Sequence, residues 1–221
     1  MDWQAFWLSV RLSVLTSLIL LAIGLPLAWW LSVTRIRWKF LIEAVVALPL
    51  VLPPTVLGFY ILTAISPQGT LGIIWNDLFG TTLPFTFQGV LIASVLYSLP
   101  FAVQPFTAAI ASVDRNIIES AWCSGVGRLQ TFLRITLPLA APGVIAGIVL
   151  SFAHTLGEFG VVMMVGGNLP GQTRTVSIAI YDNVQALNYS AASQTSLLLL
   201  AISFTILVCV YGMQRKFAVG K

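Results

Sequence analysis

Charged side chains are scarce in this chain. Only 8% of its 221 residues are Asp, Glu, Lys or Arg, whereas soluble domains average about 25%. Hydrophobic residues make up 58%, so too few polar side chains are present to cover a globule that faces water. The scarcity of charge excludes a soluble domain and predicts an integral membrane protein.

Cysteine is also rare, and the basic residues do not form a patch. The two cysteines, Cys123 and Cys209, are far apart and lack paired spacing, so we expect neither a metal site nor a disulfide framework. The net charge of +4 comes mostly from Lys and Arg at the ends of apolar runs, which argues against a nucleic-acid partner. The N-terminus lacks a basic region and a small-residue cleavage pattern, which favours a retained span over a removed signal.

Long apolar runs occupy most of the chain. A helix needs about 20 mostly apolar residues to cross the hydrocarbon core, and backbone groups in lipid must be hydrogen-bonded within their own segment. The runs that qualify cover roughly 6–33, 44–65, 90–110, 142–165 and 191–213. The sequence therefore predicts an all-α, polytopic membrane protein with about five transmembrane helices, organised as a single domain over residues 1–221.

The basic residues indicate how these spans are oriented. They gather between the first and second runs, between the third and fourth, and after the fifth, whereas the segment 66–88 has neither Lys nor Arg. Positive charge accumulates on the cytoplasmic side of membrane proteins. We therefore expect the N-terminus outside and the C-terminus in the cytoplasm. The clustered residues are Arg35, Arg37, Lys39, Arg115, Arg128, Arg134, Arg215, Lys216 and Lys221.

The segment after the fourth run has an internal pattern. Residues 166–171 have the composition of a turn, and apolar residues then recur at helical spacing. A short interfacial or re-entrant helix over about 173–188 and an ordinary surface helix both fit this pattern.

A polar interlude separates the third and fourth runs, at about 113–138. Asp114 is a suitable helix cap, and an approximate apolar face follows it. Gly125 and Gly127 interrupt this face at a cost of about 1 kcal/mol each relative to alanine, which a bent pair of closely packed helices would offset. We expect Pro138 and Pro142 to end the interlude and restart a helix. The interlude is either a docking surface for a soluble partner or an amphipathic connecting loop.

The residues of the interlude resemble the EAA motif of ATP-binding-cassette importer permeases. That motif is a glutamate, two small residues, a glycine and then an isoleucine-x-leucine-proline ending, and Ser120 departs from it mildly by replacing an alanine. In that family the segment forms the coupling helix, which docks into a cleft of the ATPase subunit. The resemblance implies that coupling to an ATPase involves Glu119, Ala121, Gly125, Arg128, Ile135, Leu137 and Pro138.

Three further segments, 48–58, 156–160 and 170–175, resemble the molybdate permease branch of that family. The resemblance implies a type I importer fold in a bacterial inner membrane, with transport of molybdate or tungstate. It also implies a homodimer, two ATPase subunits, an extracytoplasmic substrate-binding protein and contact with lipid. Sulfate and thiosulfate permeases share the Gly-Glu-Phe-Gly element, so sulfate or thiosulfate remains an alternative cargo. The chain has no phosphate-binding loop of the GxxxxGK[ST] kind, so ATP and Mg would bind the partner ATPase and no cofactor is expected here.

Prolines and one carboxylate indicate a translocation path. Prolines in the second run, and Pro100 and Pro105 in the third, interrupt backbone hydrogen bonding, which is tolerated beside protein or a wet cavity; simple kinking for packing is the alternative. An ionised carboxylate in the membrane should face the bundle interior, as part of a gate or as a structural hydrogen bond to a neighbouring helix end. The residues assigned to the path and its gate are Pro53, Pro54, Thr55, Ser98, Gly157, Glu158, Phe159 and Gly160.

Ser151, His154 and Glu158 superficially suggest a catalytic triad and hence an intramembrane hydrolase. All three would project from one straight helix, and no separate element supplies an oxyanion hole. A contact between His154 and Glu158 that keeps the carboxylate paired fits the spacing better. We therefore assign no catalytic residue and no metal ligand to the chain.

Overall fold

The computed structural model describes residues 2–219, which form helices and connecting loops with no strand. Four helices are long and apolar enough to cross a membrane, within α1 (Trp3–Val33), α5 (Phe87–Ala111), α7 to α8 (Arg128–Gly157) and α11 (Tyr189–Val219). The helices α2 (Lys39–Val51) and α3 (Pro54–Ile65) form a bent pair, and counting this pair as one span gives up to five spans. The predicted all-helical, multi-span fold is therefore confirmed.

The core of the bundle lies where α1, α5 and α8 pack together. Small residues allow this close approach: a Cβ on Gly24 would lie 3.3 Å from Val103, and one on Gly147 would lie 2.7 Å from the Phe106 ring. The Phe106 side chain is fully buried between the three helices. The arrangement is typical of membrane bundles, in which backbone proximity replaces the hydrophobic drive of a soluble core.

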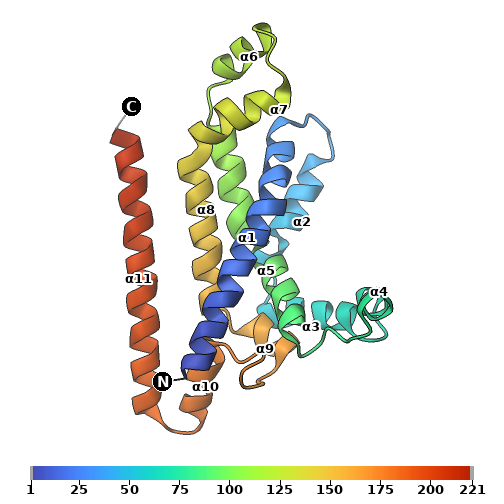
Figure 1. Cartoon of the computed structure of the whole chain (residues 1–221), viewed down its shortest axis with the longest axis vertical. Coiled ribbons are helices and arrows are strands. Elements are labelled where there is room, and N and C mark those ends of the chain that lie inside the picture. Colours follow the sequence, from blue (N-terminus) through green and yellow to red (C-terminus); the bar gives the residue numbers. More distant parts are fainter. Residues whose placement is uncertain (1, 220–221) are drawn as a thin grey trace.

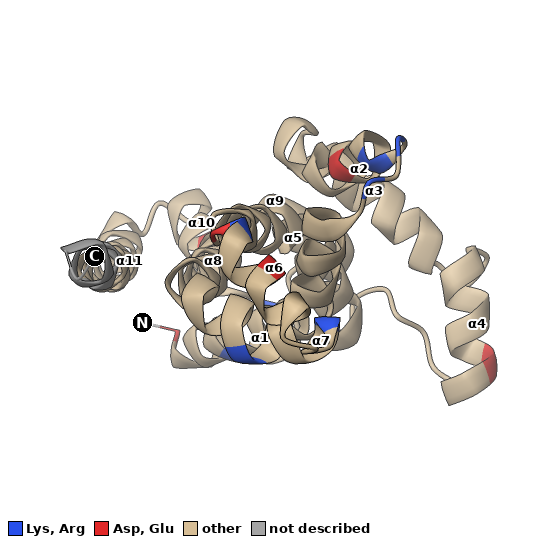
Figure 2. Ribbon diagram, turned by 90° about the horizontal axis from the view of Figure 1, so that it is seen from above, with Lys and Arg blue, Asp and Glu red and all other residues tan. Residues whose placement is uncertain are grey.

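The last helix, α11, stands apart from this core, as Figures 1 and 2 show. It packs mainly against α8 and α10 (Val176–Gln185). Its outward side chains Leu197, Leu200 and Phe204 are each about two-thirds exposed, at 67%, 65% and 66%. Such apolar exposure along a helix of spanning length is what lipid contact requires.

The second span is broken where the sequence predicts that prolines interrupt its backbone hydrogen bonding, so the run over 44–65 is not one straight helix. Helices α2 and α3 are bent by 114° across Leu52 and Pro53. Tandem prolines explain the break, because neither has an N–H to donate and each disfavours helical geometry in the residue before it. Pro100 and Pro105, by contrast, lie inside the continuous helix α5, so the expected interruption of the third span is wrong.

The fourth span also differs from the expected continuous run over 142–165. Helix α8 (Leu137–Gly157) ends before Glu158, and a separate helix α9 (Gly160–Gly166) follows. At its other end, α7 (Arg128–Thr131) continues through a π-helical turn, η1 (Phe132–Thr136), into α8 without a gap. The expected restart at Pro138 and Pro142 is therefore wrong. The widened π-turn relieves the clash that a proline makes with the preceding turn.

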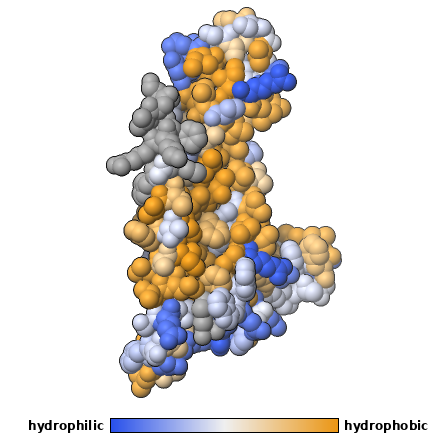
Figure 3. All heavy atoms as spheres, turned by 60° about the vertical axis from the view of Figure 1, so that its left-hand side comes forward, coloured by the Kyte–Doolittle hydropathy of each residue, from blue (hydrophilic) through white to orange (hydrophobic). Residues whose placement is uncertain are grey.

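The two ends of the bundle differ in character. Helix α6 (Arg115–Cys123), α7, the α1–α2 turn and the C-terminal end of α11 lie at one end, and α3, α4 (Thr70–Phe79), α9 and α10 lie at the other (Figure 1). The basic clusters thus share one end, as predicted. For Arg215 and Lys216 only the backbone is described, and Lys221 lies outside the described residues. Figure 3 shows a broad apolar band between more hydrophilic ends.

The predicted helix within 173–188 is present as α10. Its residues Val176, Ile178 and Ala179 are buried, and the Val176 N–H donates to the Ser9 hydroxyl of α1 at 2.8 Å. With ten residues α10 is about 15 Å long, which is too short to cross the membrane. Helix α4 instead reaches sideways from the bundle (Figures 1 and 2).

Candidate coupling and gate sites

Helix α6 begins with the predicted cap. The Asn116 N–H donates to Asp114 Oδ1 at 2.9 Å, which satisfies one of the free donors at a helix start. One turn later, Arg115 Nε and Glu119 Oε1 are 3.0 Å apart. Both side chains are mostly exposed, so this pair orders the surface of α6 without adding much stability. Glu119 therefore faces solvent at the tip of the bundle.

Gly125 follows the C-terminal end of α6, and its backbone conformation explains why a glycine occupies this position. Its φ is +81°, in the left-handed region that residues with a Cβ rarely adopt. The Gly125 N–H donates to the Trp122 carbonyl and the Val126 N–H to the Ala121 carbonyl, each at 3.0 Å. These two bonds form the Schellman cap of a helix C-terminus. Gly127, with φ of −66°, starts α7 in an ordinary conformation.

Four large apolar side chains are exposed among the polar and charged residues of α6, α7 and η1. We call Ile117, Trp122, Leu129 and Leu133 the docking patch; their exposed fractions run from 41% to 59%. Beside it, the Arg128 guanidinium lies 5.7 Å from the centre of the Trp122 ring, in cation–π contact. An apolar patch rimmed by charge at the polar end of a membrane bundle is typical of a protein–protein contact surface.

The docking patch is anchored to the bundle by Phe132. Its ring stacks on Trp29 of α1 with centroids 4.5 Å apart and planes at 22°, and it is only 6% exposed. Leu31 and Ile110 belong to the same buried cluster. Sequence reasoning missed this pair, although an aromatic residue off the apolar face of a polar interlude was an available signal.

The predicted coupling residues divide by exposure. Three of them, Glu119, Gly125 and Arg128, lie on the exposed surface of α6 and α7, and Pro138 is exposed at the start of α8. Ala121 is buried under the Schellman cap, and Ile135 and Leu137 are half-buried. The motif residues thus do not form one contact face. Some lie on the exposed surface, Gly125 sets the geometry of the turn, and the buried ones anchor the segment to the bundle. That division supports its assignment to a docking segment, which stays a prediction.

The two broken spans meet at their breaks. A Cβ on Gly160 would lie 2.6 Å from Pro54 Cβ, and one on Gly58 would lie 2.7 Å from Met164 Cβ. Both distances are shorter than real Cβ contacts, so α3 and α9 are in backbone proximity only because these positions lack side chains. Pro53 and Thr55 are exposed beside this contact. The structure thus brings the predicted path residues of the second and fourth spans together.

Glu158 lies at the break between α8 and α9. It is 8% exposed, and its Oε1 accepts the Val161 N–H at 2.9 Å. The carboxylate thus caps the start of α9, where free N–H groups favour a negative charge. The break is also tied to α10, since Ser177 donates to the Gly157 carbonyl at 3.0 Å and the Phe159 and Tyr181 rings lie 5.0 Å apart.

Ser98 is buried and engaged with a second hydroxyl. Its Oγ lies 2.9 Å from Thr155 Oγ1, which joins α5 to α8 shortly before the α8 break. The Thr155 hydroxyl also donates to the Ser151 carbonyl at 2.9 Å. Ser98 is therefore engaged between α5 and α8.

The triad arrangement is absent. Ser151 donates to the Gly147 carbonyl at 2.7 Å, and His154 packs edge-on against Phe101 and Tyr97, with ring centroids 3.8 and 4.9 Å apart. Within residues 2–219 no hydrogen bond or ion pair joins His154 to Glu158, so the expected pairing is wrong. The same described residues hold no cluster of metal-ligating side chains.

The chain is a helical bundle with an apolar band and a protruding docking patch, and two of its spans are broken where they contact each other. These features are those of a multi-pass membrane permease. Comparison with known families supports that class. The family model for the binding-protein-dependent transport system inner membrane component matches residues 11–218. The chain belongs to this family.

Three relatives give a finer comparison. The molybdenum transport system permease protein ModB of Azotobacter vinelandii is 48% identical over 219 residues, covering 99% of this chain and 96% of the relative. The protein of the same name from Escherichia coli K12 is 40% identical, covering 83% of this chain and 80% of the relative. A probable sulfate transport system permease protein, cysT of Chlorella vulgaris, is 31% identical, covering 98% and 81%.

Solved structures share the fold. A bacterial transporter that imports the polysaccharide alginate matches with a TM-score of 0.78 at 20% identity, covering 96% of this chain and 78% of the matched chain. An inward-facing MetNI methionine transporter matches with a TM-score of 0.72 at 16% identity, covering 98% and 96%. Both are ATP-binding-cassette transporters, and the likeness shows that the chain has the fold of their permease subunits.

Proposed function

We propose that this chain is the membrane permease subunit of an ATP-driven importer that carries molybdate or tungstate into the cytoplasm. The observation that carries the proposal is near-full-length identity of 48% to a molybdenum permease, together with a docking patch built on the coupling motif. The sulfate relative, at 31% identity, makes sulfate or thiosulfate the weaker candidate cargo.

Two surfaces of the chain support the partners that we propose. The docking patch would enter a cleft of an ATPase subunit, with the Gly125 cap fixing the direction in which α6 projects. Exposed apolar residues on α2 and α3, among them Val45, Val51 and Tyr60 at 67%, 81% and 64% exposed, support a second copy of the chain facing the path. Two ATPases and an extracytoplasmic substrate-binding protein would complete the importer. ATP and Mg would bind the ATPases, and no cofactor is assigned to this chain.

Transport would couple movement at the docking patch to the gate. ATP binding would draw the two ATPases and their docking patches together. The rods α5 and α8 would carry that displacement to the contact between α3 and α9, at the opposite end of the bundle (Figure 1). The outer gate would comprise Pro54, Glu158 and Gly160. In this assignment the N-terminus is outside and the C-terminus is cytoplasmic.

Uptake of labelled molybdate into vesicles tests the proposal. Vesicles that hold this chain with its ATPase and binding protein should accumulate molybdate only with ATP, and tungstate should compete more strongly than sulfate. A matched ATPase variant that cannot hydrolyse ATP is the control. Nucleotide-independent accumulation would refute the ATP-driven mechanism, and stronger competition by sulfate would reassign the cargo.

Docking can be tested separately through a native thiol. Cys123 is free and exposed at the end of α6, beside the docking patch. A short thiol-directed crosslinker on Cys123 should capture the ATPase, whereas Cys209 on α11 should not. Failure of Cys123 to reach the ATPase in an assembled, active complex would remove the docking assignment.

A further inference from the structure

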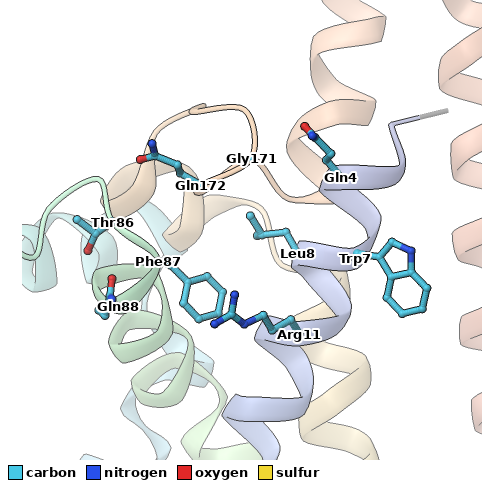
Figure 4. Close-up of a pocket in the computed structure, with 9 residues that line it drawn as sticks. All are labelled: Gln4, Trp7, Leu8, Arg11, Thr86, Phe87, Gln88, Gly171 and Gln172. Atoms are coloured by element: carbon cyan, nitrogen blue, oxygen red, sulfur yellow. The ribbon is translucent and has the colours of Figure 1, made fainter.

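A cavity of about 560 Å³ opens between α1, the start of α5 and the loop after α9, at the end of the bundle opposite the docking patch. Figure 4 shows its lining residues, which include Arg11 and the amide side chains of Gln4, Gln88 and Gln172. No acidic residue is among those that line it. The cavity therefore offers one cation and several hydrogen-bond donors without a negative charge to neutralise them.

Arg11 is held in place but not neutralised. Its guanidinium carbon lies 4.7 Å from the centre of the Phe87 ring, and Figure 4 shows the side chain reaching from α1 toward α5. Across the described residues no carboxylate forms an ion pair with Arg11, whereas Arg174 pairs with Asp182 and with Asp2. Stacking on a ring leaves the in-plane N–H donors of a guanidinium free for a ligand.

The depth of Arg11 in the membrane indicates the kind of ligand. Helix α1 has 31 residues and is about 46 Å long, whereas the hydrocarbon core is about 30 Å thick. Arg35 and Arg37 directly follow the C-terminal end of α1, so we place one boundary of the hydrocarbon core at that end. About 20 helical residues cross the core, so its other boundary lies near residue 13. Arg11 therefore lies at the level of the opposite headgroups, with the exposed Trp3 and Trp7 as interfacial anchors.

We propose that this cavity binds a tetrahedral oxyanion group, namely the phosphate of an anionic phospholipid in the leaflet opposite the docking patch. Arg11 donates paired N–H bonds to two phosphate oxygens, and the glutamine amides bind the remaining oxygens and the glycerol hydroxyls. Leu8 and Trp7, which also line the cavity, contact the start of an acyl chain. A free oxyanion, the transported one included, has the same chemistry, but the depth and the tryptophans favour a lipid.

Native mass spectrometry of the purified chain tests this site. Equal amounts of phosphatidylglycerol and phosphatidylcholine are offered, and the ratio of bound lipids is measured. The unmodified protein should prefer phosphatidylglycerol by about tenfold. Arg11→Gln should abolish the preference, Arg11→Lys should keep part of it, and Gln88→Ala, at an exposed position, should reduce it without disturbing the fold.

The control is Arg37→Gln, which removes the same charge at the opposite end of α1 and should leave the preference unchanged. An equal loss in Arg37→Gln, or an unchanged preference in an Arg11→Gln protein with native circular dichroism, overturns the proposal. In a second arm, phosphate and molybdate are each added to lipid-depleted protein and thermal unfolding is followed. The anions could raise the unfolding temperature of the unmodified protein but not of Arg11→Gln, while neither protein prefers phosphatidylglycerol. That result would retain an oxyanion site at Arg11 and overturn its assignment to a lipid. Both arms measure binding, so their outcome is independent of transport.

Discussion

Replacing Gly125 by alanine should uncouple ATP hydrolysis from transport. The added Cβ meets no atom within 4 Å, so the only penalty is the left-handed backbone at φ of +81°, about 1–2 kcal/mol for a residue with a side chain. Helix α6 can relieve this strain by releasing the two cap bonds from Gly125 and Val126. A penalty of that size reduces the population of the docking-competent conformation about 5- to 30-fold.

Gly127 provides a matched control. A Cβ there also meets nothing within 4 Å, but its φ of −66° suits any residue. Gly127→Ala should leave coupling unchanged, and Gly125→Asn should fall between the two, because asparagine tolerates the left-handed region. Gly125→Ala and Gly127→Ala therefore add the same methyl group and differ in backbone strain.

The assay is the number of molybdate ions imported per ATP hydrolysed in vesicles that contain the assembled importer. That ratio should fall several-fold for Gly125→Ala when it is measured for equal amounts of assembled complex. Equal ratios for Gly125→Ala and Gly127→Ala would refute the assignment of Gly125 to a strained cap that docking requires.

Three further substitutions probe other parts of the chain. Phe132→Ala removes the stacking partner of Trp29 from a buried cluster and should destabilise the protein by about 3–5 kcal/mol, seen as a lower unfolding temperature in detergent. Gly160→Ala places a Cβ 2.6 Å from Pro54 Cβ and should abolish uptake while the ATPase still binds; normal uptake would contradict the gate assignment. Ser151→Ala removes only a bond to a carbonyl of its own helix and should leave uptake within about twofold, whereas an intramembrane hydrolase would lose all activity.

The sequence predicted the spans well and their interruptions poorly. Apolar length alone located the crossings, because the hydrocarbon thickness sets it. The break at Pro53 is visible in sequence, since tandem prolines remove two donors. The break at Glu158 is not, because glycine and glutamate are both compatible with a continuous helix, and only the capping of α9 shows why the chain interrupts there.

The candidate sites show the same division between local and long-range information. The coupling role of residues 119–138 is predicted from their resemblance to a family motif, which can be recognised in a single sequence because it is local. The stack of Phe132 on Trp29 joins residues about 100 positions apart, and the contact of Pro54 with Gly160 joins two separate spans. Neither pairing leaves a periodicity or spacing signal in a single sequence. Both depend on which helices become neighbours.

Helix α8 touches both candidate sites. It continues from the docking segment through η1 and ends at the Glu158 break, and the bond between Ser98 and Thr155 holds it to α5 near that break. If α5 and α8 move as one rod, Ser98→Ala and Thr155→Val should each weaken uptake without changing ATPase binding. The double variant should then be no worse than the more damaging single one, because both remove the same interaction. Strictly additive losses would mean that the two hydroxyls act separately, and that α8 carries the signal without α5.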